Sequence, residues 1–115
     1  MPLQPGKWIA NVGGQATELT IAGVDPSGDV SAYFGPTYPE VGGRWDEDSQ
    51  RLTLLSWPQL FVAYLFTDPI NLTGVNGTVF FTLAGVVDNF SYGGIGPSPT
   101  AKRLTFGWYA QIGVD

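Results

Sequence analysis

The residue types that carry most enzymatic chemistry are scarce in this sequence. Its 115 residues include no His and no Cys, which excludes Ser-His-Asp and Cys-His nucleophilic systems and the usual zinc ligand sets. Three of the ten acidic residues, Asp46, Glu47 and Asp48, are consecutive in an expected hairpin turn, where solvation is the ordinary interpretation. A calcium site there would need more oxygen ligands at defined offsets. We therefore expect no catalytic residue, no metal site and no cofactor.

Aromatic side chains are the best candidates for a binding function. The chain has four Trp, five Tyr and seven Phe. At the open end of a small barrel, such rings could line a pocket for an apolar or planar ligand. The alternative is that they pack in the core of the barrel and bind nothing. The predicted ligand-binding residues are Tyr33, Trp45, Trp57, Tyr64, Phe106 and Trp108.

Charge argues against two classes of partner. The net charge is −5, and the nearest approach to a basic run is Lys102-Arg103, so we expect no nucleic-acid partner and no binding to an anionic membrane. The uncharged stretch Leu52–Thr67 is interrupted by Trp57-Pro58-Gln59 and is not expected to span a membrane. No signal peptide is visible, which leaves a cytoplasmic protein and a mature secreted form both open. Asn71, Asn76 and Asn89 each begin an Asn-x-Ser/Thr triplet.

The elements that would position these side chains are strands. Short apolar runs alternate with turn signals such as Asp25-Pro26-Ser27-Gly28, and no run has sustained helical spacing. The predicted strands are Lys7–Val12, Ala16–Ala22, Asp29–Phe34, Glu40–Asp46, Arg51–Trp57, Leu60–Thr67, Thr78–Val87 and Lys102–Ile112. Asp88–Thr100, with five Gly or Pro, is the longest predicted loop. We predict one all-β domain over residues 1–115, an antiparallel up-and-down eight-stranded barrel, with a two-sheet β-sandwich as the alternative.

The two halves of the chain differ in how their strands alternate. Strands two to four alternate between apolar and polar residues, whereas the later strands are apolar on both faces, which indicates burial on both faces. We infer a homo-oligomer, a dimer or a tetramer, that covers the outside of the second half. The alternative cover is the Asp88–Thr100 loop. The predicted interface residues are Phe61, Val79, Phe81, Leu83 and Tyr109.

Two short motifs carry a family resemblance. Gly6-Lys7-Trp8 on the first strand, with Arg103 on the last, resembles the calycin pattern of lipocalins and avidins. Val41–Asp46, which reads Val-Gly-Gly-Arg-Trp-Asp, is similar to the fourth strand of streptavidin. The resemblance covers the first half of the chain and implies that Trp8 closes one end of the barrel while Arg103 stacks over it.

The ligand residues of the avidin group do not carry over. Ala10 stands where avidins have an Asn that binds the ureido group of biotin, and Gly14 replaces the Ser of the following turn. Tyr33 lies one position away from the third-strand Tyr. Each lost hydrogen bond to a buried polar ligand costs about 1–3 kcal/mol, so biotin binding is not expected.

Three functions remain open on the sequence alone. The first is a non-catalytic barrel that binds a small apolar or aromatic molecule. The second is a structural or assembly protein with a filled barrel, acting through its apolar outer face. The third is a cofactor-free barrel isomerase, which would act mainly by shaping a bound substrate.

Overall fold

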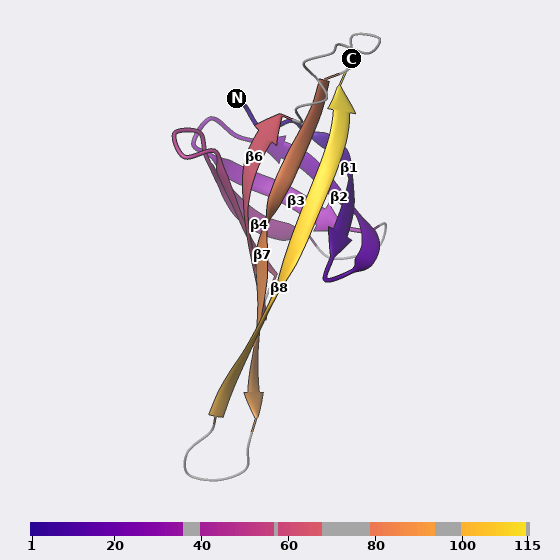
Figure 1. Ribbon diagram of the computed structural model, residues 1–115. Coiled ribbons are helices and arrows are strands. Elements are labelled where there is room, and N and C mark those ends of the chain that lie inside the picture. The colour runs from indigo at the N-terminus through magenta and orange to yellow at the C-terminus, as the bar shows by residue number, and fades with distance from the viewer. Residues whose placement is uncertain (36–39, 57, 68–78, 94–99, 115) are drawn as a thin grey trace.

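The protein is a closed barrel of eight strands (Figure 1). The computed structural model describes residues 1–35, 40–56, 58–67, 79–93 and 100–114. The strands are β1 (Gly6–Val12), β2 (Gln15–Val24), β3 (Asp29–Phe34), β4 (Val41–Asp46), β5 (Arg51–Ser56), β6 (Gln59–Thr67), β7 (Val79–Gly93) and β8 (Thr100–Val114). Within this part of the chain no helix is long and apolar enough to cross a membrane.

Every strand pairs antiparallel with its neighbour in sequence, and β8 closes the barrel on β1. The closing pairs run from Ile9 opposite Gln111 to Val12 opposite Trp108. The prediction of an antiparallel up-and-down eight-stranded barrel is therefore confirmed, and the sandwich alternative is wrong because the strands form one continuous sheet. The architecture is compatible with calycin-like folds.

Turn chemistry explains why the early strands are short. One carboxylate oxygen of Asp25 accepts the N–H groups of Ser27 (2.9 Å) and Asp29 (3.0 Å), which closes the β2–β3 turn. Gly28 completes that turn with φ +96°, and a Cβ there would lie 2.6 Å from the carbonyl oxygen of Trp45. Only glycine satisfies both the dihedral angle and the close approach of β4.

Alternate residues of each strand point into the barrel and form its core. The bulky side chains that are almost wholly buried are Trp8, Leu19, Ile21, Leu52, Leu54, Leu83 and Val87. These side chains fill the middle of the barrel, as expected for eight strands. Any space for a ligand must therefore lie toward an end of the barrel.

The last two strands are much longer than the sequence predicts. β7 and β8 have 15 residues each and project beyond the barrel as a two-stranded ribbon (Figure 1). Their register is unbroken from Val79 opposite Val114 to Gly93 opposite Thr100. The prediction of a loop over Asp88–Thr100 is wrong for residues 88–93, because all five Gly and Pro residues of that segment fall within 93–99. The Asn89 triplet consequently begins within a strand.

Candidate ligand-binding site

The barrel has a solvent-open hollow of about 870 Å³ at one end. We call this end the mouth: it carries the Gly13-Gly14 turn between β1 and β2, and the β7–β8 ribbon projects from it. The opposite end, where the chain starts, is the N-terminal end. The apolar residues that line the hollow are Val12, Phe34, Val41, Phe61 and Phe106.

Three aromatic rings stack beneath the hollow. The rings of Phe34 and Phe61 are 4.7 Å apart, and the indole of Trp108 meets Phe61 edge-on at 5.4 Å and Phe34 at 6.3 Å. The Nε1 of Trp108 donates to the carbonyl oxygen of Val62 at 3.3 Å. Trp108 is buried and does not itself line the hollow; it supports from below the two Phe rings that do.

The rim of the hollow is polar but uncharged. Gln15, Thr17, Ser56 and Gln59 line it from the ends of β2, β5 and β6. Among the described residues, the lining contains no ionisable side chain. Burying a charge without a partner is costly, so this lining suits a neutral molecule that can accept or donate a few hydrogen bonds.

A glycine turn makes room for one wall of the hollow. Gly13 has φ +59°, and a Cβ at this position would lie 2.8 Å from the ring of Phe106. The Gly13 N–H also donates to the carbonyl oxygen of Gly107 at 3.0 Å. The turn therefore holds the edge of β8 in place and fixes Phe106 against the mouth.

The six predicted ligand residues do not gather at one place. Phe106 lines the mouth and Trp108 lies in its aromatic floor. Trp45 is inward-facing and buried, but it lies near the last residue of β4, beside the turn at residues 47–50, and so belongs to the N-terminal end of the barrel. The side chains of Tyr33 and Tyr64 follow the outward alternation of β3 and β6. Trp57 lies outside the described residues.

The residues of the mouth that the prediction missed are Phe34, Phe61 and the polar rim. A usable signal was present: Gln15, Thr17, Ser56 and Gln59 are polar residues at inward-facing positions near strand ends. Inward polar residues at the end of an otherwise apolar stripe indicate an opening rather than a sealed core.

The structure buries Trp8 in the barrel, but it does not place Arg103 over Trp8 as the resemblance implies. Trp8 is fully buried, and its Nε1 donates to the carbonyl oxygen of Gln4 at 3.1 Å. Arg103 does not stack over Trp8, because it lies on the ribbon at the other end. Its guanidinium instead binds the carboxylate of Asp88 with two hydrogen bonds of 2.8 and 3.0 Å and lies 5.8 Å from the ring centre of Phe90.

The ion pair between Asp88 on β7 and Arg103 on β8 links the two strands where the ribbon leaves the barrel. The hydroxyl of Thr105 also donates to Asp88, whose side chain is almost wholly covered. Hydrogen bonds from Arg103 and Thr105 lower the pKa of Asp88. The carboxylate is thus charged at neutral pH. It joins the two strands of the ribbon on the side that continues the outside of the barrel.

Only part of the predicted oligomer interface faces solvent. Phe61 and Leu83 point inward and are buried in this chain, and Phe81 packs against the core, so these three are not available to a partner. Val79 and Tyr109 are exposed. The strands are two-sided, as predicted, but apart from Tyr109 the outer side is made by residues that were not in the interface prediction. We call this set the outer face, and it comprises Ile9, Tyr64, Phe66, Val86 and Tyr109.

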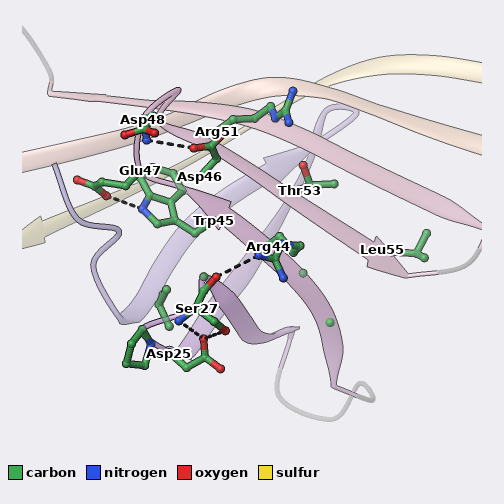
Figure 2. Close-up of a pocket in the computed structure, with 15 residues that line it drawn as sticks. Asp25, Ser27, Arg44, Trp45, Asp46, Glu47, Asp48, Arg51, Thr53 and Leu55 are labelled. Atoms are coloured by element: carbon green, nitrogen blue, oxygen red, sulfur yellow. Dashed lines mark hydrogen bonds between the residues drawn. The ribbon is translucent and has the colours of Figure 1, made fainter.

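A second hollow, of about 780 Å³, lies on the outside of β4 and β5, beside the turns at the N-terminal end (Figure 2). Several of its polar groups bind one another. Arg44 binds Asp29 at 2.8 Å and the carbonyl oxygen of Ser27 at 3.0 Å. The Nε1 of Trp45 donates to Glu47 at 2.6 Å, and the amino terminus and Trp45 together lower the pKa of Glu47. No group of three or more acidic side chains in the described ranges could hold a metal ion.

Comparisons with known protein families, with curated proteins and with solved structures found no match to the chain.

Proposed function

We propose that this protein is a non-catalytic binding barrel that holds a small, neutral, largely apolar or aromatic molecule in the mouth. The main support for this proposal is the hollow of about 870 Å³, whose floor is the Phe34–Phe61–Trp108 cluster. Ligand sites commonly combine such apolar walls with a few placed polar groups in a volume of roughly 300–1,000 Å³. The polar rim would orient the ligand, and the aromatic floor would supply most of the affinity.

The uncharged lining favours binding over catalysis. General acid–base chemistry needs a titratable group within hydrogen-bond reach of the substrate. The described lining offers only amides and hydroxyls, and these hydroxyls have no neighbouring base to activate them. A barrel isomerase is accordingly the less favoured alternative.

The experiment is a titration with N-phenyl-1-naphthylamine, a neutral aromatic probe, followed by tryptophan fluorescence. Trp108 lies directly under the hollow, so bound probe should quench its emission. Thr17→Glu puts a carboxylate into the hollow and should weaken probe binding at least about tenfold, equivalent to ~1.4 kcal/mol. Thr20→Glu makes the same change three residues along β2, on the outside of the barrel, and should leave the affinity unchanged. Equal affinities for the two variants would refute binding in the mouth.

We also propose that two copies of the chain associate through the outer face, which spans β1, β6, β7 and β8. No charged residue occurs in Gln59–Thr67, Val79–Val87 or Leu104–Val114. The five outer-face side chains, from Val86 at 43% exposed to Ile9 at 74%, expose on the order of 500 Å². That is most of the ~800 Å² that each partner contributes to a stable interface.

A second copy suits this surface because only another uncharged apolar face can cover it without desolvating charges. Tyr109→Glu should make the protein dissociate, as measured by sedimentation equilibrium, while its far-UV circular dichroism stays unchanged. Ser31→Glu, which adds the same charge at an exposed position of β3, a strand outside the outer face, is the control. A wild-type protein that is monomeric at every accessible concentration would refute the association.

The relation to calycins is proposed on the barrel topology together with the Gly6-Lys7-Trp8 triplet. Biotin is not the ligand we propose. Ala10 points inward and has no polar atom to offer, and the Asn11 side chain accepts the N–H of Gly14 at 2.9 Å in the exposed turn.

A further inference from the structure

The β7–β8 ribbon has a backbone edge that no other described strand covers. On the barrel, β1 pairs with β8, but it ends at Val12, opposite Trp108. Among the described residues no strand continues that pairing along Thr100–Phe106, and the ribbon stands apart from the barrel in Figure 1. Seven residues of β8, about 23 Å of strand, are therefore paired on one side only.

The hydrogen-bond alternation shows which residues face that edge. Gly13 donates its N–H to the carbonyl oxygen of Gly107, so Gly107 points its backbone groups toward β1. In an antiparallel ladder this direction alternates from residue to residue, and β8 keeps an unbroken register with β7. The N–H and carbonyl groups of Ala101, Arg103 and Thr105 consequently face the free edge, while those of Leu104 face β7.

A two-stranded ribbon is marginally stable by itself in water, and stability usually needs a third strand or a covered apolar face. This ribbon continues well past its last barrel contacts, with Leu104 63% exposed on the side that continues the barrel interior. A free edge of this length without Pro or a bulge is a template for another strand. The ribbon can therefore accept a further strand along the unpaired edge of β8.

We propose that the free edge of β8 pairs antiparallel with the same edge of a second copy, which completes a four-stranded sheet. Pairing about a two-fold axis at Arg103 places Ala101 opposite Thr105 of the second copy and uses every edge-facing backbone group. The paired stretch is Thr100–Phe106 on both chains. It ends one residue before Gly107, whose edge is already taken by Gly13.

Charge favours a second copy as the occupant. The two-fold axis brings Arg103 opposite Arg103 of the second copy, and like charges opposite each other normally destabilise a sheet. Here each guanidinium is bound by Asp88 of its own chain, so each copy brings a neutral pair to the axis. An edge built for an acidic foreign peptide would instead leave this arginine unpaired. This second interface is independent of the outer face and of ligand binding in the mouth.

The test removes the edge donor of Ala101 without touching the pairing with β7. Ala101→Pro deletes that N–H, and Ala101→Ser keeps it and serves as the matched control. Both are made together with Tyr109→Glu, which removes association through the outer face. By sedimentation equilibrium at concentrations up to the millimolar range, the serine variant should reach twice the 12.3 kDa chain mass and the proline variant should associate at least about tenfold more weakly. Equal masses for the two variants, whether monomeric or dimeric, would overturn the proposal.

Amide hydrogen exchange gives a second readout that does not depend on a variant of the ribbon. In the Tyr109→Glu protein at dimer-forming concentration, the amides of Arg103 and Thr105 should be protected as well as that of Leu104, and they should lose protection on dilution. Leu104 is the internal reference, because its N–H bonds to β7 in either state. Rapid exchange of Arg103 and Thr105 beside a protected Leu104 at all concentrations would overturn edge pairing, whatever the result of the probe titration.

Discussion

Replacing Gly85 with alanine should destabilise the barrel strongly. Gly85 lies on β7 between Ala63 on β6 and Trp108 on β8. A Cβ at this position would overlap the carbonyl oxygen of Val62 and lie 2.7 Å from the Cα of Ala63. Both obstacles are backbone atoms, so the clash cannot be relieved by turning a flexible side chain.

Overpacking in a protein core costs about 1–3 kcal/mol, and a backbone clash belongs at the upper end of that range. We expect Gly85→Ala to lower the free energy of unfolding by about 3 kcal/mol and Tm by roughly 10 °C or more. The same carbonyl oxygen of Val62 accepts the hydrogen bond of Trp108, so the floor of the mouth should be disturbed as well. Urea unfolding followed by tryptophan fluorescence measures the first effect, and the naphthylamine titration measures the second.

Gly42 provides the matched control. It also lies within a strand, but a Cβ there would meet nothing within 4 Å. Gly42→Ala should be neutral or stabilise the protein by up to about 1 kcal/mol, because alanine restricts the unfolded chain. If Gly85→Ala were as stable as Gly42→Ala, the close approach of β6 and β7 at the floor of the mouth would be wrong.

Three further substitutions test the core, the ribbon and the wall of the mouth. Leu83→Ala should lower the free energy of unfolding by about 2–5 kcal/mol in urea denaturation, because this fully buried side chain leaves a cavity; a change below 1 kcal/mol would contradict its core position. The pKa of Asp88 is lowered by Arg103, so its stabilising effect is present above about pH 4 and is lost as the pH falls through the lowered folded-state value. The stability difference between wild type and Asp88→Asn should therefore shrink in acid, and a difference that is constant from pH 7 to pH 2 would contradict the ion pair. Gly13→Ala forces a side chain into left-handed backbone and against Phe106. It should therefore lower the free energy of unfolding by about 1–2 kcal/mol in urea denaturation and weaken probe binding. Unchanged values for both would contradict the packing of the Gly13 turn against Phe106.

The topology could be predicted from the sequence because turn chemistry and alternation are local signals. Asp25–Gly28 and Gly13-Gly14 each close a hairpin between runs of period two, and consecutive hairpins of short strands lead to a closed meander. The prediction of a loop over Asp88–Thr100 misses the ribbon because Gly and Pro are frequent in that segment as a whole, although all five of them lie within 93–99. The strand pattern continues through its first five residues, Asp88–Tyr92.

The candidate site was harder to predict for two physical reasons. Alternation tells which residues share a face, but where both faces of a strand are apolar it does not tell which face is inside. The prediction of Leu83 as an interface residue is wrong for this reason, because Leu83 is a fully buried core residue. Alternation also says nothing about height along the barrel axis, so Trp45 and Trp108, both inward-facing, lie toward different ends.

Intermolecular nuclear Overhauser effects between N-phenyl-1-naphthylamine and the protein test ligand binding in the mouth most directly. The probe should show contacts with the ring protons of Phe34, Phe61 and Phe106, which surround the hollow, and none with Trp45 at the other end. Contacts confined to Trp45 or to the outer face around Tyr109 would contradict the mouth as the binding site.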